Sequence, residues 1–252
     1  MALILFVGEA ADGTWLPPRG GEEGAPTQDL WLAFRALVNV REPWPVDHDL
    51  LAAQDELLQG LIAEAGITAV GATAASPLDQ RLRLWRGDIT TLAADAIVNA
   101  ANDGMTGCWA PLHYCIDNAI HTFAGVQLRL YCAQVMKRQG GEEAAGGAKL
   151  TPAFDLPSRY VLHTVGPMVS GTVTSKDCET LASCYRACLD LADAKGLRSA
   201  AFCCISTGEF GFPNEPAAEI AVDVVRAHKA VREKRIRVIF NVFKERDENI
   251  YH

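Results

Sequence analysis

Residues 199–213 read SAAFCCISTGEFGFP, and this stretch indicates how the chain folds. Its first seven residues form an apolar run of strand length, and a loop that contains two glycines follows. Helical spacing then predicts a helix over 216–233, and another apolar run predicts a last strand over 237–243. A buried strand, a loop, a helix and a further strand in this order are typical of an α/β fold.

The same alternation extends back to residue 80. Apolar runs and helical spacing predict strands over 82–85, 96–99 and 160–165 and helices over 116–139 and 180–194. Strands that alternate with helices favour three layers, with a largely parallel or mixed sheet in the middle. In open sheets of this kind, ligands bind beyond the carboxyl ends of the strands. Functional side chains are therefore expected among the residues that follow each strand.

The first 79 residues differ from the rest in composition and in the spacing of their apolar residues. Residues 8–27 are rich in glycine, proline and glutamate, which is typical of a mobile loop or linker. Apolar residues at helical spacing then predict helices over 29–40 and 47–64. The expected organisation is a flexible segment over 1–28, a helical extension over 29–79 and an α/β domain over 80–252.

Composition disfavours several classes of partner. The chain has 23 Lys and Arg residues against 31 Asp and Glu residues, a formal charge of −8, which disfavours nucleic acid as the main partner. No apolar run approaches the roughly 18 residues of a membrane helix, and the start lacks the basic region of a secretory signal. We expect a cytoplasmic protein with no membrane partner and no framework of disulfides among its eight cysteines.

Residues 107–115 read GCWAPLHYC and bring Cys108, His113 and Cys115 close together in the sequence. Two thiolates and an imidazole are ligands that zinc prefers, and three protein ligands leave a fourth position open for water or substrate. The alternative is three unrelated side chains in one loop. The zinc deaminases of nucleobases are excluded, because the chain lacks both His-x-Glu and Pro-Cys-x-x-Cys.

Several more loops carry groups that suit a nucleotide. Backbone N–H groups of the loop 205–213 can cradle a diphosphate, and Phe210 and Phe212 can cover a base or sugar. Asp88 follows a strand and either accepts from an exocyclic amine or caps a short helix. Asn99 and Asn102 offer amides either to ribose hydroxyls or to a turn.

Asp117 and His121 lie four residues apart at the start of the helix predicted after the metal-type residues. Asp117 either caps that helix or polarises a water or a ribose hydroxyl beside a metal. We expect His121, and His163 in its apolar strand, to be structural residues of the interior.

Taken together, these motifs resemble the macrodomain family. Residues 85–90 (WRGDIT), 95–102 (DAIVNAAN) and 205–208 (ISTG) match its general pattern, and residues 107–121 resemble its zinc-containing branch. Residues 29–64 are similar to the N-terminal helical extension of that branch. The resemblance implies an α/β protein, a three-layer α/β/α macrodomain sandwich with a mixed sheet, preceded by an α-helical N-terminal extension.

The resemblance also implies a site for ADP-ribose and its hydrolysis from mono-ADP-ribosylated proteins. It assigns zinc to Cys108, His113 and Cys115 and catalysis to Asn102 and Asp117. Asp88 would meet the adenine amine, and Asn102 would face the distal ribose. The full set of implied ADP-ribose-binding residues is Asp88, Ile89, Asn99, Asn102, Ser206, Thr207, Gly208, Glu209, Phe210, Asn241 and Phe243.

The expected reaction is zinc-dependent removal of ADP-ribose from ester linkages on Asp or Glu, while serine-linked and nucleic-acid-linked ADP-ribose stay open. Some relatives of this branch accompany a sirtuin-like transferase and a lipoylated carrier protein, which the resemblance implies as partners. A non-catalytic ADP-ribose reader with a structural zinc is a competing hypothesis. A structural site normally has four protein ligands, and His121 is the only close candidate for a fourth, which favours the enzyme. A hydrolase of a different nucleotide and a pure interaction module also stay open.

Overall fold

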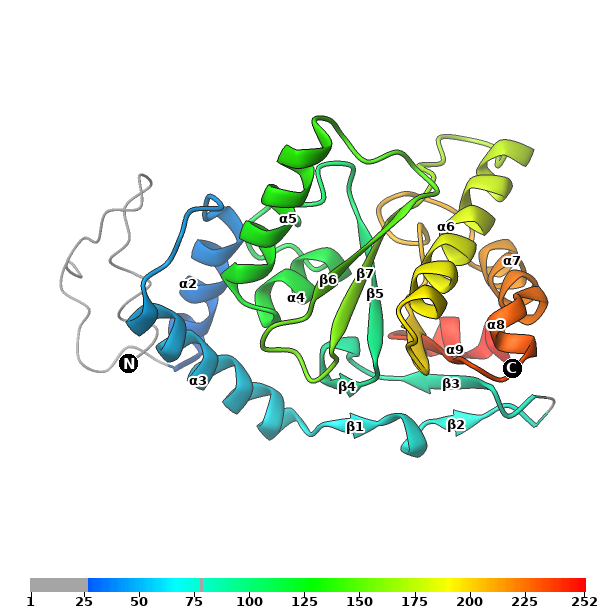
Figure 1. Cartoon of the computed structure of the whole chain (residues 1–252), viewed down its shortest axis with the longest axis horizontal. Helices are drawn as coiled ribbons and strands as arrows, with labels where there is room; N and C mark the ends of the chain where they lie inside the picture. Colours follow the sequence, from blue (N-terminus) through cyan, green and yellow to red (C-terminus); the bar gives the residue numbers. More distant parts are fainter. Residues whose placement is uncertain (1–26, 78) are drawn as a thin grey trace.

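The computed structural model, which describes residues 27–77 and 79–252, contains a seven-stranded mixed sheet between two layers of helices (Figure 1). The five central strands are parallel, and an antiparallel strand lies at each edge. In order across the sheet, the strands are β2 (Ala74–Ala75), β3 (Leu82–Arg86), β9 (Arg237–Val242), β8 (Ser199–Phe202), β5 (Ala96–Ala101), β7 (Tyr160–Val165) and β6 (Ala148–Pro152). The predicted α/β sandwich with a mixed sheet is confirmed.

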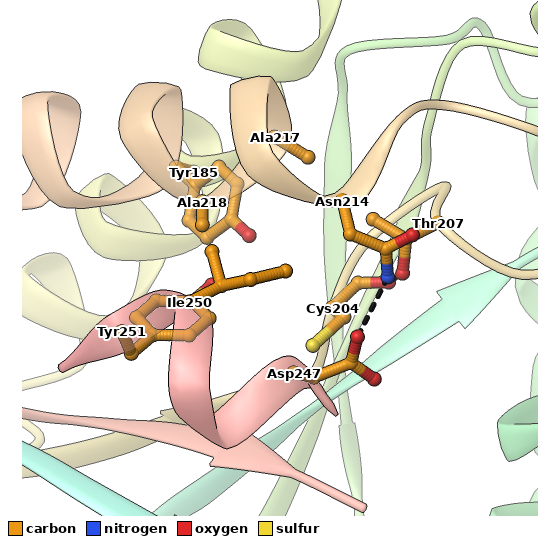
Figure 2. A pocket seen from close by; sticks show the side chains of 9 residues that line it. All are labelled: Tyr185, Cys204, Thr207, Asn214, Ala217, Ala218, Asp247, Ile250 and Tyr251. Carbon is orange, nitrogen blue, oxygen red and sulfur yellow. Dashed lines mark hydrogen bonds between the residues drawn. The ribbon is translucent and has the colours of Figure 1, made fainter. Parts of the chain in front are cut away.

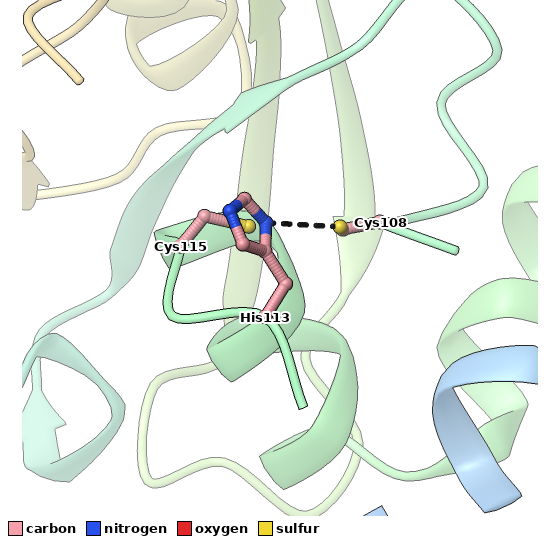
Figure 3. A group of neighbouring side chains, drawn as sticks. All are labelled: Cys108, His113 and Cys115. Atoms are coloured by element: carbon pink, nitrogen blue, oxygen red, sulfur yellow. Dashed lines mark hydrogen bonds between the residues drawn. The ribbon is translucent and has the colours of Figure 1, made fainter. Parts of the chain in front are cut away.

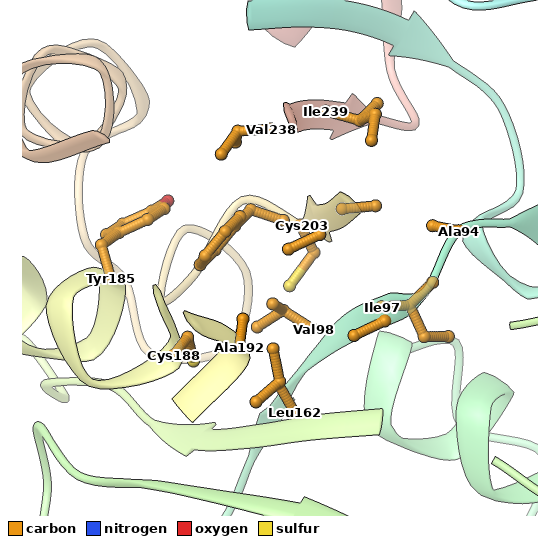
Figure 4. Close-up of a cluster of buried hydrophobic side chains, with 14 of the residues drawn as sticks. Ala94, Ile97, Val98, Leu162, Tyr185, Cys188, Ala192, Cys203, Val238 and Ile239 are labelled. Atoms are coloured by element: carbon orange, nitrogen blue, oxygen red, sulfur yellow. The ribbon is translucent and has the colours of Figure 1, made fainter. Parts of the chain in front are cut away.

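The helices divide between the two faces of the sheet (Figure 1). One layer consists of α4 (Ile116–Phe123) and α5 (Val126–Gln139). The other consists of α6 (Ser175–Ala194), α7 (Asn214–Ala227), α8 (Lys229–Arg232) and α9 (Glu245–Tyr251), where α9 packs on α7, β3 and β9. Figure 4 shows part of the apolar core between sheet and helices, which includes Val98, Leu162, Tyr185 and Cys203.

Two predicted helices are each two helices in the structure. The helix predicted over 116–139 is interrupted at Gly125, whose φ of 83° lies in the left-handed region that glycine tolerates. The helix predicted over 216–233 is interrupted at His228, which has extended backbone and whose ring accepts from the N–H of Ala230. Helix α6 begins earlier than predicted, because Thr174 and Asp177 form a reciprocal capping box.

The N-terminal extension packs against the first helical layer (Figure 1). Its helices α2 (Thr27–Val40) and α3 (His48–Ala65) bury Phe34, Leu50 and Leu58 in a cluster that also contains Val126 of α5. The chain then forms β1 (Thr68–Ala69), which pairs with β4 (Leu92–Ala93). A 3₁₀ turn, η1 (Val70–Ala72), and the edge strand β2 follow. Within the region 66–79, which the sequence assigns to the extension, residues 74 and 75 form β2 and pair with β3 of the main sheet.

The flexible segment predicted over 1–28 lies outside the described residues, apart from residues 27 and 28, which begin α2. Within the described part of the chain, every helix is too short or too polar to cross a membrane.

Candidate functional site

The predicted site residues gather at one edge of the sheet, because parallel strands present their carboxyl ends at the same side. Asp88 follows β3, Asn102 follows β5, and Phe243 follows β9. The loop that begins at Ser206 follows β8. The sheet therefore brings together segments that lie up to 155 residues apart in the sequence, since 243 − 88 = 155.

Cys108, His113 and Cys115 lie together in the loop between β5 and α4 (Figure 3). Their ligand atoms all lie within 4.8 Å of one another, and Cys108 Sγ is 3.4 Å from His113 Nδ1. All three residues are half-buried, so solvent reaches the group. This donor set fits zinc, for which two thiolates and an imidazole are common ligands.

The environment of Cys115 favours the neutral thiol unless a cation lies beside its sulfur. Its Sγ accepts from the N–H of Asn118 at 3.4 Å, because Cys115 is the N-cap of α4. Burial raises the pKa of Cys115 to about 12, and the neighbouring Cys108 and Asp117 act in the same direction. A bound metal ion reverses this effect, because a coordinating thiol is deprotonated.

Asp117, in the first turn of α4, follows this loop directly and has only 5% of its surface exposed. Its Oδ1 accepts from the amide of Asn99 at 2.7 Å, and its Oδ2 faces the amide of Asn102 at 3.4 Å. Burial raises the pKa of Asp117 to about 6, although the Asn99 hydrogen bond opposes that shift. The two predicted catalytic residues are therefore in contact.

Asn99, which was predicted to contact a ribose, instead contacts other side chains in the protein interior. Its side chain is fully buried, and besides Asp117 its amide lies 3.2 Å from His163 Nδ1. His163 Nε2 in turn lies 2.9 Å from the hydroxyl of Thr151. A role in ADP-ribose binding stays a prediction for Asn99. The contact present in the structure holds the Asp117 carboxylate.

A second group of metal-type side chains lies in the interior. The ligand atoms of His121, Cys132 and His163 lie within 4.8 Å of one another, and all three residues are buried. Both nitrogens of His163 already face protein partners, Asn99 and Thr151. Burial lowers the pKa of His163 to about 3 and that of His121 well below its usual range, so both rings are neutral. The sequence-based assignment of both histidines to the interior is confirmed.

Four of the predicted ADP-ribose-binding residues lie at or near the ends of β3 and β9: Asp88, Ile89, Asn241 and Phe243. Asp88 caps the short 3₁₀ turn η2 (Ile89–Thr91), because its Oδ1 accepts from the N–H and the hydroxyl of Thr90. Asn241 is buried and donates to the carbonyl of Gly87 at 3.0 Å, which ties the two strand ends together. Ile89 is also buried, whereas Phe243 is 74% exposed and free to cover a ligand.

The loop after β8 turns tightly. Ser206 has a φ of 64°, its carbonyl accepts from Phe212 N, and the carbonyl of Gly208 accepts from the N–H of Gly211. Thr207 donates its hydroxyl to the carbonyl of Cys204. The expectation that Phe212 covers a base or sugar is wrong, because its ring is 1% exposed and belongs to the core. Phe210 is only partly buried, against Met105 and its neighbours.

Glu209 connects this loop to the metal loop. Its Oε1 lies 3.6 Å from Nε2 of His113, whose second nitrogen faces Cys108. A carboxylate in this position is the partner that a metal-binding histidine commonly has, since it orients the ring. The sequence indicated only a backbone role for Glu209, and no local pattern pairs it with a residue 96 positions earlier, since 209 − 113 = 96.

A small pocket between α7, α9 and the end of β8 is separate from the metal loop (Figure 2). Tyr185, Asn214, Asp247 and Tyr251 are among its lining residues, and Asn214 donates to Asp247 at 2.8 Å. Of the predicted site residues, Thr207 alone lines it. The pocket therefore borders the loop after β8 on the side that faces α7 and α9.

Comparisons with known proteins bear on this site. A model of the family described as Macro domain matches residues 98–221. Two relatives are named protein-ADP-ribose hydrolase. The one from Treponema medium is 54% identical over 88% of this chain and 85% of the relative. The one from Staphylococcus aureus strain MRSA252 is 45% identical over 89% of this chain and 84% of the relative. A Trypanosoma brucei macrodomain in complex with ADP-ribose superposes with a TM-score of 0.64 at 29% identity, over 91% of this chain and 95% of that one. An Oceanobacillus iheyensis macrodomain with ADP gives 0.61 at 38% identity, over 68% and 87%.

Proposed function

The chain belongs to the macro domain family, and from this premise we propose that it is a protein-ADP-ribose hydrolase that works with a zinc ion. The observation that carries the proposal is the group formed by Cys108, His113 and Cys115, whose last member is the N-cap of α4, two residues before the buried Asp117 in the first turn of that helix. A metal group that solvent reaches, next to a buried carboxyl group whose pKa is raised to about 6, suits hydrolysis better than binding alone.

The proposed substrate lies along the side of the sheet where the parallel strands have their carboxyl ends. The adenine lies near Asp88 and Phe243, and the diphosphate lies against the backbone of the loop after β8. The distal ribose then reaches Asn102 and the metal group, which is the part of the site where bond cleavage takes place. This placement is supported by the order of the loops along the sheet edge and by the related macrodomains solved with ADP and ADP-ribose.

Hydrolysis breaks the bond between the anomeric carbon of the distal ribose and the ester oxygen of the modified protein. A zinc ion held by Cys108, His113 and Cys115 would act as a Lewis acid and lower the pKa of a bound water or hydroxyl. Asn102 orients the ribose or the attacking water through its amide. Asp117 accepts the proton that the water loses as its oxygen bonds to the anomeric carbon. The bonding electrons leave with the protein carboxylate, which needs no protonation, so we propose Asp and Glu esters as the substrate class.

The test measures release of ADP-ribose from a protein that is mono-ADP-ribosylated on Asp or Glu. Wild type, Cys115→Ala and the control Cys178→Ala, which changes a half-buried thiol in α6, are compared for turnover and zinc content. We expect about one zinc per chain and turnover in wild type and in the control, both lost in Cys115→Ala. A serine-linked substrate, assayed in parallel, reports the linkage specificity.

Turnover that survives complete removal of zinc would refute zinc dependence. Tight ADP-ribose binding without release from any linkage would refute the hydrolase and leave a reader of the modification.

A further inference from the structure

The metal loop, residues 106–115, has no regular secondary structure and needs external support. Two of its residues, Gly107 and Leu112, have φ values of 84° and 58°, in the left-handed region. Glycine adopts this conformation freely, but for a branched side chain such as that of Leu112 it is unfavourable by about 1–2 kcal/mol. The geometry of the metal ligands therefore depends on contacts that hold Leu112 and its neighbours in place.

Asn39, the residue before the end of α2, supplies one of these contacts. Its Oδ1 accepts from the N–H of Leu112 at 3.0 Å, and its Nδ2 donates to the hydroxyl of Thr122 at 3.1 Å. Only 1% of Asn39 is exposed. A buried amide with both ends bonded fixes its partners in position, because losing either bond leaves a buried group unsatisfied.

Arg129 of α5 holds the beginning of the same loop. Its Nε donates to the carbonyl of Thr106 at 2.8 Å, and its Nη2 lies 3.4 Å from the carbonyl of Cys108. Its Nη1 donates to the carbonyls of Asn39 and Arg41 at 2.8 and 2.9 Å, which also satisfies the end of α2. Arg129 is 4% exposed, so one buried guanidinium fastens the metal loop to the extension.

Asn118 of α4 is the third support. Its Nδ2 donates to the carbonyl of Ala110 at 3.1 Å, and its N–H donates to Sγ of Cys115. Arg35 of α2 donates to Oδ1 of Asn118 at 3.3 Å. Helix α2 therefore contacts the metal loop directly at Leu112, and it is linked to the carbonyls of Ala110 and Cys108 through Asn118 and Arg129.

We propose that Asn39 and Arg129 are positioning residues for the zinc ligands, and that the N-terminal extension is a working part of the metal site. This inference rests on the proposed function, since it assumes that the loop binds zinc. The two residues act on the backbone that carries the ligands. Preorganised ligands bind a metal more tightly than ligands that must be ordered during binding.

Gln54 of α3 offers a matched control. It is also buried in the extension, and it bonds to the N–H of Val126 at 2.9 Å and to Gln127 and Asp155. These partners lie at the start of α5 and in the turn after β6, away from the metal loop. Asn39→Ala and Gln54→Ala therefore remove comparable buried amides from the same extension, and only the first removes support for the loop.

The experiment measures the zinc dissociation constant of the full-length wild type, Asn39→Ala and Gln54→Ala by competition with a chromophoric chelator. We expect about a 10-fold to 100-fold weaker zinc affinity for Asn39→Ala and little change for Gln54→Ala, while both lose thermal stability without metal. Cobalt(II) spectra should change in Asn39→Ala alone, because they report the geometry of the ligands. Arg129→Lys, which keeps the charge but loses the fork of donors, should also weaken zinc binding.

Equal zinc affinities and cobalt spectra for Asn39→Ala and Gln54→Ala would overturn this inference and leave the zinc proposal intact. If Asn39→Ala fails to fold, an unchanged zinc affinity of Arg129→Lys would overturn it. Wild type without affinity for zinc would instead overturn the zinc part of the proposed function, and this inference with it.

Discussion

Asp117 is almost completely buried, and each of its carboxyl oxygens faces a neutral side-chain amide. Burial alone disfavours the charged form, and the hydrogen bond from Asn99 and the charge of Arg129 offset part of that effect. The outcome is a carboxylate that is fixed in direction and can accept a proton near neutrality. Its position at the start of α4 adds the favourable field of a helix N-terminus.

Asp117→Asn keeps the size of the side chain but removes its ability to accept a proton. We expect kcat for ADP-ribose release to fall about 10²-fold to 10⁴-fold, as for loss of a general base. Zinc content and ADP-ribose affinity should stay close to those of wild type. Steady-state kinetics, metal analysis and calorimetric titration measure the three quantities.

Asp103→Asn is the control for that substitution, because Asp103 is an exposed carboxylate at the beginning of the same connection between β5 and α4. The role assigned to Asp117 is contradicted if both variants lose activity equally, or if Asp117→Asn changes KM while kcat stays the same.

The elements that the sequence predicted are those with a single strong pattern. Strands β5, β7 and β9 are apolar along most of their length because helices cover both faces of the sheet. Strand β6 was not predicted, because it contains Lys149 and Pro152, which are tolerated at the edge of a sheet but are more typical of a loop. Helix α9 was missed because its sequence is mostly charged and polar. The break between α4 and α5 was missed because a single glycine within a helical pattern is a weak signal.

Gly125, at that break, is required for two separate reasons. Its φ of 83° is unfavourable for other residues, and an added Cβ would lie 2.3 Å from Nε2 of Gln54 and 2.8 Å from Oδ2 of Asp155. Gly125→Ala should therefore lower the free energy of unfolding by about 2–4 kcal/mol. Thermal and urea unfolding of the variant measure the loss.

Gly140→Ala separates the two reasons. Gly140 ends α5 with a φ of 78°, and nothing lies within 4 Å of an added Cβ. This variant is destabilised only through its backbone conformation, by about 1 kcal/mol. Equal losses in the two alanine variants would show that the contact of Gly125 with the extension has no energetic weight.

Asp155, in the turn between β6 and β7, gives the docking of the extension a pH dependence. Burial raises the pKa of Asp155 to about 7, the nearby Asp55 acts in the same direction, and hydrogen bonds from Gln59 and Gln54 oppose the shift. Because the folded pKa lies above the unfolded value, folding favours the protonated form. The stability that this group contributes is complete below the unfolded pKa of about 4 and is lost as the pH rises towards 7.

Asp155→Asn should remove this dependence. Between about pH 5 and about pH 8, we expect wild type to lose about 1–2 kcal/mol relative to the variant, which corresponds to a few degrees in Tm. Thermal unfolding of both proteins in matched buffers measures the difference, and the carboxylates that they share cancel. Parallel pH profiles of Tm for the two proteins would contradict the assignment.

In the folded chain, the sequence predicted the location of the candidate site better than the contacts that hold the metal loop in place. Strand order brings Asp88, Asn102 and the loop after β8 to one edge, and residues that follow strands can be read from the sequence. The contact between Asn39 and Leu112 spans 73 residues, and that between Asn39 and Arg129 spans 90. Contacts this long follow no local period, so only the folded chain reveals that α2 supports the metal loop.

These contacts predict that the extension and the α/β domain unfold as one unit. Phe34 and Leu58 are fully buried, Trp31 packs on Phe123 with ring centroids 5.5 Å apart, and buried amides cross the same boundary. An extension that docked weakly would leave a large apolar face on α4 and α5 exposed whenever it detached. Native-state hydrogen exchange should give the slowest amides of α3 a free energy of opening close to that of β5.

Calorimetry should then show one transition, with equal calorimetric and van't Hoff enthalpies. Asn39→Ala lowers the whole transition in that case, because the extension and the metal loop share one cooperative core. A separate early transition, or α3 amides that open several kcal/mol more easily than those of β5, would mean that the extension is an independent unit. The metal loop would then lose its support at temperatures where the sheet is still folded, and zinc would dissociate before the main transition rather than with it.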